Sequence, residues 1–367
     1  MTSLILDGHK LNWHRDRVEA LLGGERVAPI TIDCALTRAC TYRCTYCYGQ
    51  LQANDEKRLT RDVIYRFLDD AAEIGVKAVS FVSDGESTCS PHLYDALHRG
   101  KGNGLDLALG TNGFLLNDDR LNEILPILTY LRFNISAATA IEYARVHGCP
   151  ESCFHKVSKT ISKCVEIKNQ KELPVTIGLQ MVLLPSLGEQ IIPLAVLGKQ
   201  LGVDYLVIKH CSDDENGSLG VDYSRYEELV DILDEAESHS DSEYLVRAKW
   251  SKILSHGKRK YSRCYGPPLI MQFSGSGLVA PCGMLFNRKY QRYHIGNIAE
   301  TSFKKLWESD RYWEVINDIA SEWFDARTMC GTLCLQHKVN EFLWDFKRGD
   351  IAFPDNFEDP PLHHNFI

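Results

Sequence analysis

The stretch APITIDCALTRACTYRCTYCYG (residues 28–49) decides the fold, because it joins a strand-like apolar run to a cysteine-rich segment. Its first part, APITIDCAL (28–36), is a nearly continuous apolar run, which is typical of a parallel strand covered on both faces. Three cysteines follow, at Cys40, Cys44 and Cys47. Zinc sites and iron–sulfur clusters usually have a full set of protein ligands, so three thiols leave one coordination position open. The stretch therefore predicts a strand that ends at an incompletely ligated metal centre.

Strand-like and helical runs alternate after this stretch. Strands are expected at 77–85, 105–113, 130–139, 175–185 and 204–212, and helices at 61–75, 91–100, 118–128, 154–170 and 189–202. Six strand–helix units with right-handed connections predict an α/β fold, a partial (βα)6 TIM-like barrel. Active sites of such barrels lie at the C-terminal ends of the strands, where the three cysteines also fall.

The alternation ends near residue 213. A helix is expected at 224–238, a β-hairpin at 267–283 that turns at SGSG, and helices at 302–309, 311–319 and 335–346. These elements predict a second, smaller α+β domain after the barrel. We expect an N-terminal helical cap (1–28), the partial barrel (29–215), a linker helix region (216–260) and the small α+β auxiliary domain (261–367).

Composition narrows the cellular setting. The 367 residues carry a net charge of −8, which provides no global basic field for nucleic acid or an anionic membrane. The one strong basic run, KRKYSR (258–263), is interpreted as a solvated loop. No apolar stretch has the length of a membrane-spanning helix, and the N-terminus lacks the layout of a signal peptide. We expect a cytoplasmic protein whose thirteen cysteines serve metal or redox chemistry, because disulfides do not persist there.

The three-then-two spacing of Cys40, Cys44 and Cys47, just after the first barrel strand, resembles the radical S-adenosylmethionine (radical SAM) superfamily. The resemblance implies a [4Fe–4S] cluster whose fourth iron binds the amino and carboxylate groups of S-adenosylmethionine (SAM). It also implies that a flavodoxin- or ferredoxin-type reductant supplies the electron that cleaves SAM. The 5′-deoxyadenosyl radical then removes a hydrogen atom from a substrate. The alternative for the three thiols is a zinc site completed by a remote histidine or cysteine.

Further landmarks of the family fall at strand ends in the same order. An aromatic residue precedes the third cysteine, and SDGES (83–87) stands where the family usually has a Gly-Gly-Glu-Pro turn. Backbone groups of this turn could receive the ammonium and carboxylate of the cofactor. The resemblance covers about residues 30–212 and implies these cofactor-binding residues: Tyr46, Asp84, Gly85, Glu86, Asn112, Asn134, Ser136, Gln180 and Met181.

Four cysteines lie in the C-terminal region, at Cys264, Cys282, Cys330 and Cys334. Their order around the hairpin resembles the auxiliary-cluster extension of radical SAM proteins called the twitch domain, the shortened form of SPASM. The resemblance implies one auxiliary [4Fe–4S] cluster with four cysteine ligands. The spacing departs from the family in the last pair, where three residues intervene instead of two. The alternative is a structural zinc site held by the same thiolates.

A second cluster favours an oxidation. A substrate radical that loses one further electron to that cluster, and a proton to a base, undergoes dehydrogenation or forms a new bond. The competing reaction is epimerisation, in which a cysteine thiol returns a hydrogen atom. Lys209 and His210, at the end of the sixth strand, are the candidate bases, and Cys211 is the candidate hydrogen-atom donor. Cys34 and Cys164 are expected to be small core residues.

The substrate is expected to be a small carbohydrate-, aminocyclitol- or nucleoside-like molecule, or a peptide. A polar cluster after the fourth strand could bind sugar hydroxyls or peptide; it consists of Glu142, Tyr143, Arg145 and His147. The helical run 11–27 is expected to cap the open end of the barrel, with docking of a partner as the alternative. An interpretation from another class is a non-enzymatic iron–sulfur electron carrier, which would not need a barrel with cofactor landmarks.

Overall fold

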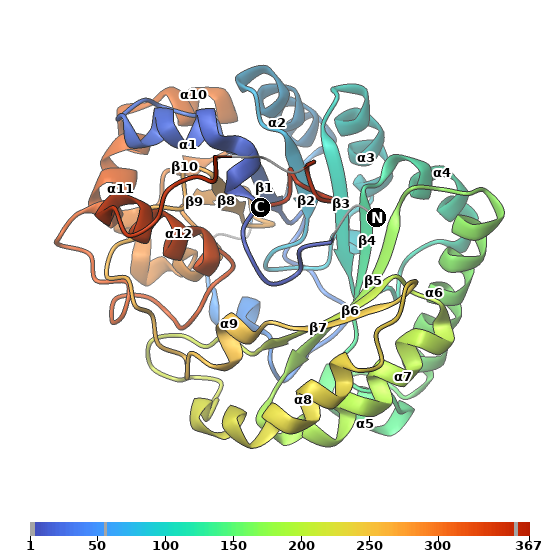
Figure 1. Cartoon of the computed structure of the whole chain (residues 1–367). Coiled ribbons are helices and arrows are strands. Elements are labelled where there is room, and N and C mark those ends of the chain that lie inside the picture. Colours follow the sequence, from blue (N-terminus) through green and yellow to red (C-terminus); the bar gives the residue numbers. More distant parts are fainter. Residues whose placement is uncertain (1–3, 55–56, 356–358) are drawn as a thin grey trace.

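The computed structural model describes residues 4–54, 57–355 and 359–367, and within them ten strands form one curved sheet (Figure 1). The strand order is β10-β9-β8-β1-β2-β3-β4-β5-β6-β7. All neighbouring strands from β8 through β1 to β7 pair parallel. At the β10 edge of the sheet, β9 pairs antiparallel with β8 and β10 pairs antiparallel with β9. The strands are β1 (Thr31–Cys34), β2 (Ala78–Phe81), β3 (Asp106–Thr111), β4 (Tyr130–Asn134), β5 (Thr176–Leu183), β6 (Tyr205–His210), β7 (Leu245–Ala248), β8 (Ile270–Phe273), β9 (Leu278–Ala280) and β10 (Gly296–Asn297). This is the partial α/β barrel that the sequence predicts.

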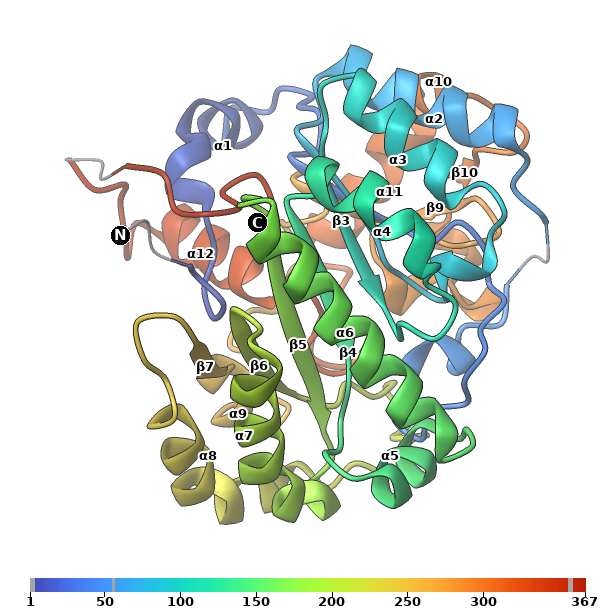
Figure 2. The same ribbon diagram turned by 90° about the vertical axis from the view of Figure 1, so that its right-hand side faces the viewer.

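The helices that connect the parallel strands lie mostly on the outer side of the sheet (Figure 1). Figure 2 shows α6 and α7 running along the outside of β5 and β6. The helices are α1 (Arg15–Leu22), α2 (Arg61–Ile74), α3 (Leu93–Gly102), α4 (Leu121–Ile124), α5 (Ala140–His147), α6 (Ser152–Gln170), α7 (Ile191–Leu201), α8 (Val230–Glu237), α9 (Trp250–Ile253), α10 (Phe303–Glu308), α11 (Asp310–Ala320) and α12 (His337–Arg348).

Helix α2 shows how local sequence sets these boundaries. The Thr60 hydroxyl accepts a hydrogen bond from the Val63 amide and caps the N-terminus. Gly75 ends the helix with φ of 98°, a left-handed conformation that glycine adopts without strain. The apolar residues Ile64 and Phe67 share one buried face, which packs on the sheet side of the helix.

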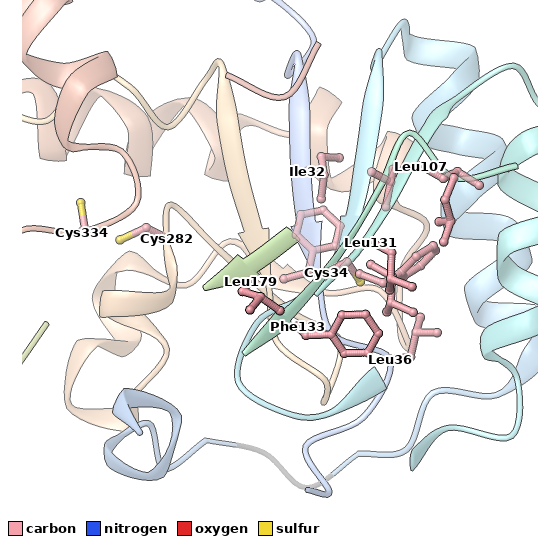
Figure 3. Close-up of a cluster of buried hydrophobic side chains, with 14 of the residues drawn as sticks. Ile32, Cys34, Leu36, Leu107, Leu131, Phe133, Leu179, Cys282 and Cys334 are labelled. Atoms are coloured by element: carbon pink, nitrogen blue, oxygen red, sulfur yellow. The ribbon is translucent and has the colours of Figure 1, made fainter. Parts of the chain in front are cut away.

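Side chains on each strand alternate between the outer core and the barrel interior. On β4, Leu131 and Phe133 are fully buried in the cluster that Figure 3 shows, together with Cys34 of β1 and Leu179 of the adjacent β5. Arg132, the residue between them on β4, therefore points into the barrel. This alternation places polar groups inside the barrel and apolar groups under the helices. Cys34 is a core residue, as expected.

Two elements differ from the sequence interpretation. Segment 216–260, expected to be a linker helix region, contains α8 but also β7, a seventh strand parallel to β6. The hairpin strand β8 pairs parallel with β1, so the predicted hairpin extends the barrel sheet and does not stand apart from it. The β7 strand is only four residues long and includes the charged Arg247, which explains why the pattern did not indicate it. The domain boundaries themselves stay a prediction.

The N-terminal and C-terminal segments meet at the N-terminal ends of the strands. The Lys10 ammonium donates to the Phe366 carbonyl (2.7 Å), and the hydroxyl of Thr31, the first residue of β1, donates to the Asn365 carbonyl (2.6 Å). The predicted cap thus lies at the end of the barrel opposite the cysteine loop that follows β1. No helix of the described residues is long and apolar enough to cross a membrane.

Candidate active site

The three N-terminal cysteines lie in the loop after β1 and carry free thiols. Cys40 is exposed, whereas Cys44 and Cys47 are partly buried. The last turn of α5 holds this loop, because the Thr45 amide donates to the Val146 carbonyl (2.9 Å). The helix therefore fixes the backbone that presents the thiols.

A buried histidine contacts one of these thiols. The imidazole of His147 is fully buried, and burial lowers its pKa to about 3, so it is neutral. Its Nε2 accepts a hydrogen bond from the Ser136 amide (3.1 Å), which leaves the ring proton on Nδ1. Nδ1 lies 3.3 Å from Cys44 Sγ and 3.4 Å from the Tyr46 hydroxyl oxygen. His147 can therefore donate a hydrogen bond to the Cys44 sulfur.

A cavity of about 270 Å³ opens beside the three cysteines. Most of the predicted cofactor-binding residues line it, namely Tyr46, Asp84, Gly85, Glu86, Asn112, Asn134 and Gln180. The Asn112 amide donates to the Thr41 hydroxyl (3.0 Å) and lies 3.9 Å from Cys40 Sγ. The structure therefore brings the cysteine loop and the ends of β2 to β5 to one space.

The acidic side chains of the SDGES turn hold neighbouring loops in place. The Glu86 carboxylate accepts a hydrogen bond from the backbone amide of Asn112 (2.7 Å). The Asp84 carboxylate accepts from the Ser274 hydroxyl (2.6 Å) and from the backbone amide of Gly275 (2.8 Å). Since both side chains bind protein groups, any cofactor contact from this turn would come from its backbone.

Two glycines let this turn and the hairpin approach the chain just before Cys40. A Cβ on Gly85 would lie 1.9 Å from the Thr37 carbonyl oxygen, and a Cβ on Gly275 would lie 2.1 Å from the Thr37 carbonyl carbon. Both contacts are to backbone, which cannot turn aside as a flexible side chain can. The two glycines therefore clamp the Thr37 backbone.

Two of the predicted cofactor-binding side chains lie outside this cavity. Met181 follows Gln180 along β5, so it points to the opposite face and is fully buried in the core. The Ser136 hydroxyl, also fully buried, accepts from the Val182 amide (3.1 Å) and ties two strands together. Neither of these side chains reaches the cavity, whereas Gln180, the other residue expected on β5, faces it.

A second cavity of about 220 Å³ adjoins the first. The two share the lining residues Tyr48, Gly49, Val82, Ser83, Asp84, Gln180, Lys209 and Ser212. The second cavity is lined further inside the barrel by Asp33 and Arg132, and it reaches Cys334 of the C-terminal region. The combined space thus extends from the three-cysteine loop to the four-cysteine group.

The three residues predicted to be catalytic occupy different environments. Lys209 lines both cavities. His210 borders the first, but it is 1% exposed and its ring lies 5.5 Å from the Tyr223 ring. Cys211 is fully buried with its thiol 3.7 Å from the Tyr46 carbonyl oxygen, and among the described residues it lines neither cavity. Burial raises the pKa of the Cys211 thiol to about 12. Lys209 is therefore the one of the three that reaches both cavities.

The polar cluster expected after β4 is divided by α5. Glu142 and Arg145 form an ion pair on the surface, with 2.9 Å between carboxylate Oε2 and guanidinium Nε. Tyr143 and His147 are fully buried on the other side of the helix. The cluster therefore does not form one surface site for sugar or peptide, because helical spacing separates its members.

The four C-terminal cysteines line one enclosed space. Figure 3 shows Cys282 and Cys334 next to each other there. All four thiols are free. The Asn340 side-chain amide donates to Cys264 Sγ (3.4 Å), as it would to a metal-bound thiolate. The structure thus gathers Cys264, Cys282, Cys330 and Cys334 although they are distant in sequence.

Two buried cations accompany these thiols. Burial lowers the pKa of Arg259, but the Cys330 and Cys334 thiolates outweigh this effect and raise it above its ordinary value. The Lys252 ammonium donates to the Cys334 carbonyl (2.8 Å). Arg259 belongs to the run 258–263 that was expected to be a solvated loop; that prediction is wrong for Arg259, which is 8% exposed and donates to two backbone carbonyls. Neither its charge nor its spacing marks it as buried.

Both sets of thiols suit iron–sulfur clusters in their chemistry. Three free thiols beside an open cavity leave room for a further ligand, and four enclosed thiols beside buried cations suit a cluster of negative total charge. Zinc held by four thiolates would also be negatively charged, so the second argument does not separate the two metals. Within the part of the chain that the structure describes, no three His, Cys, Asp or Glu side chains are grouped as around a single metal ion.

Comparison with protein families agrees with this arrangement. Residues 35–192, which include the three-cysteine loop, match the radical SAM superfamily. Residues 264–334, which begin and end at auxiliary cysteines, match SPASM, an iron–sulfur cluster-binding domain. The chain belongs to the radical SAM superfamily and is a radical SAM enzyme with a SPASM auxiliary iron–sulfur cluster domain.

Among curated proteins, the chain is similar to the AdoMet-dependent heme synthase of Methanosarcina barkeri (strain Fusaro). The two are 26% identical over 333 residues, which cover 85% of this chain and 90% of the relative. A tungsten-containing aldehyde ferredoxin oxidoreductase cofactor-modifying protein of Pyrococcus furiosus is 23% identical over 294 residues, or 76% of this chain and 80% of the relative.

Two solved structures share the fold. Streptococcus suis SuiB bound to S-adenosylmethionine has a TM-score of 0.64 at 17% identity, covering 85% of this chain and 72% of SuiB. Native anSMEcpe with bound AdoMet has a TM-score of 0.54 at 15% identity, covering 86% of this chain and 94% of anSMEcpe. These likenesses support the partial barrel followed by the SPASM region.

Proposed function

We propose that this enzyme oxidises its substrate by two electrons, as a dehydrogenase or a bond-forming maturase. The observation that carries the proposal is the continuous space between the two cysteine groups, formed by the two cavities with shared lining residues. A substrate in that space would lie near the SAM-binding group on one side and Cys334 on the other. Bound there, SAM and two [4Fe–4S] clusters would supply hydrogen-atom abstraction and a one-electron acceptor.

In this proposal the N-terminal cluster is held by Cys40, Cys44 and Cys47, and the auxiliary cluster by the four C-terminal cysteines. Residues 29–215 form the radical SAM barrel and 261–367 the auxiliary domain; β7 extends the barrel sheet next to β6, and β8 of the auxiliary region extends it next to β1. The exposed Cys40 gives a flavodoxin- or ferredoxin-type reductant access to the first cluster.

Asp33 is the residue best suited to accept the substrate proton. It lines the second cavity, and burial raises the pKa of its carboxyl group to about 7, against the opposing effects of Arg132 and Lys209. A carboxylate with a pKa near the working pH is an effective general base. The sequence pointed to Lys209 and His210 and missed Asp33, which lies inside the first strand and not at a strand end.

The SAM-binding residues proposed are those that line the first cavity: Tyr46, Asp84, Gly85, Glu86, Asn112, Asn134 and Gln180. A peptide is one proposed class of substrate, since SuiB has been solved with precursor peptide SuiA and anSMEcpe with a peptide. A small carbohydrate-, aminocyclitol- or nucleoside-like molecule is the other expected class.

Epimerisation is the second candidate reaction. It requires a thiol that reaches the substrate, and Cys211 is separated from both cavities in the described structure. This favours oxidation over epimerisation with Cys211 as donor.

The test is anaerobic turnover of reconstituted enzyme with SAM and dithionite in deuterated water, using candidate substrates from each class. A product that is lighter by two hydrogens supports oxidation. A product of unchanged composition that carries one deuterium on carbon indicates epimerisation. SAM that stays uncleaved under reduction contradicts radical chemistry altogether.

A further inference from the structure

The second cavity is built around an arginine inside the barrel. Arg132 is the third residue of β4, and its register partners are Gly110 on β3 and Gly178 on β5. The Tyr205 ring fills the space beside Gly178, where an added Cβ would lie 2.1 Å from it, and one guanidinium nitrogen of Arg132 lies 3.9 Å from the Cβ position of Gly110. Arg132 and Lys209 of β6 both line this cavity.

Neither basic side chain is held in an ion pair by the residues that the structure describes. Within the described residues, Arg132 and Lys209 form no ion pair and no side-chain hydrogen bond, and Arg132 Nε is buried without a partner. The nearest aromatic contact is the Tyr130 ring, 5.6 Å from the guanidinium carbon. A buried, unpaired charge is unfavourable unless something compensates it.

The acidic residues of the cavity do not provide that compensation. Asp84 is already paired with Arg38, with 3.3 Å between carboxylate Oδ2 and guanidinium Nε. Asp33 forms no ion pair with Arg132 or Lys209 among the described residues; burial raises the pKa of its carboxyl group to about 7 in spite of both nearby charges, so it is only partly ionised at neutral pH. Burial lowers the pKa of Lys209 well below its ordinary value, and the charges of Lys252, Arg132 and Lys249 lower it further, so a nearby anion is what would keep Lys209 protonated. The cavity therefore holds the charge of Arg132 without an ion-pair partner, beside a lysine that an anion would protonate, in a protein whose net charge is −8.

We infer that the substrate carries a carboxylate or phosphate group, which Arg132 and Lys209 bind inside the barrel. The inference rests on the proposed function and narrows its substrate class. A peptide carboxylate, an organic acid or a nucleotide supplies the missing negative charge. A cationic aminocyclitol would add to the positive charge, and a neutral sugar would leave both cations unpaired. The anion keeps Lys209 protonated, so Lys209 binds and Asp33 is left as the base.

The carboxylate of SAM is not the expected ligand of this pair. Arg132 lines the second cavity and not the cavity beside the three cysteines, among the residues described. Lys209 borders both, so the affinity for SAM must be measured in its variant.

The test is isothermal titration of the SAM-loaded, reconstituted holoenzyme with glutarate and with inorganic phosphate, using uncharged glutaramide for comparison. Binding of glutarate identifies a carboxylate site and binding of phosphate a phosphate site. Arg132→Gln and Lys209→Met are each expected to lower the affinity for the anion by at least about tenfold, because each variant removes one of its two buried basic partners. Arg145→Gln, which removes an exposed charge, serves as the matched control and is expected to bind as the unmodified enzyme does.

Charge-preserving variants separate charge from packing. Arg132→Lys and Lys209→Arg are expected to retain most of the binding, and SAM affinity is expected to stay unchanged in Arg132→Gln. The inference is overturned if neither anion binds, if the neutral variants bind as tightly as Arg145→Gln, or if the charge-preserving variants lose binding as completely as the neutral ones. Reductive SAM cleavage is measured in parallel. If SAM is cleaved but the anion result is negative, the substrate inference fails while the radical chemistry stands.

Discussion

The clamp on Thr37 predicts a large effect from one methyl group. Gly85→Ala would place a Cβ 1.9 Å from the Thr37 carbonyl oxygen and 2.8 Å from Arg38 Cα, so the backbone before Cys40 must move by more than an ångström. Forcing an extra methyl group into packed structure typically costs about 1–3 kcal/mol. We therefore expect the free energy of unfolding to fall by about that amount. The displaced loop should also bind iron less well at the three-cysteine site.

Matched variants make this prediction specific. Gly275→Ala, whose Cβ would lie 2.1 Å from the Thr37 carbonyl carbon on the hairpin side, should have a similar effect. Gly102→Ala is the control, because its added Cβ meets nothing within 4 Å and helix α3 ends there. Urea unfolding of the cluster-free proteins and iron analysis of the reconstituted ones provide the two measurements. If Gly85→Ala is as stable as Gly102→Ala and binds as much iron, the clamp has no structural role and the reasoning is refuted.

The remaining predictions concern three polar residues. His147→Phe removes the hydrogen-bond donor to Cys44 and should make the reduction potential of the SAM-binding cluster more negative, since hydrogen bonds to cluster sulfur stabilise the reduced state. His147→Asn keeps a donor near the position of Nδ1 and should restore much of the original potential. Spectroelectrochemistry measures both potentials. Asp33→Asn should lower kcat by about 10²–10⁴-fold. In the unmodified enzyme the rate should rise as pH increases through about 7, because only the ionised Asp33 carboxylate accepts a proton, and the variant should lack this rise. An unchanged pH profile in the variant would exclude Asp33 as the base. Arg259→Gln should reduce iron retention at the auxiliary site, since it removes the cation beside Cys330, whereas Arg259→Lys should retain more; equal iron in both would contradict a role for the charge.

The sequence predicts the parallel strands well because each is an apolar run between turn residues. β1, β3 and β5 fall inside the expected ranges, and their ends carry the residues that the resemblance singles out. The seventh strand was missed because Leu245–Ala248 is short and alternates buried with half-buried residues among charged neighbours. Parallel pairing of β8 with β1 is a long-range contact, which local periodicity does not encode.

The candidate site was predictable where spacing or order carries the information. The seven cysteines gather in two groups as expected, and seven of the nine residues predicted to bind the cofactor line one cavity. Met181 was misplaced because a buried strand does not reveal which of two successive residues points inward. Arg132 and Arg259 were missed because a charged residue is ordinarily expected at the surface, whereas both lie inside the protein. Only the three-dimensional arrangement shows their surroundings.

His147 illustrates the same limit at the level of one hydrogen bond. Its sequence context, a polar segment after a strand, indicates a surface residue, yet helix α5 turns it inward against Cys44. The contact depends on the packing of α5 against the cysteine loop, which brings residues about a hundred positions apart together. No local pattern contains that information.

The most direct measurement is the metal content of the Cys40→Ala, Cys44→Ala, Cys47→Ala triple variant after anaerobic reconstitution, determined for iron and zinc together. Loss of one of two clusters should leave about half the iron of the unmodified protein and no stoichiometric zinc. The account would be contradicted if the triple variant kept as much iron as the unmodified protein, or if the unmodified protein held zinc at these three thiols. Either result would show that Cys40, Cys44 and Cys47 are not ligands of the catalytic cluster.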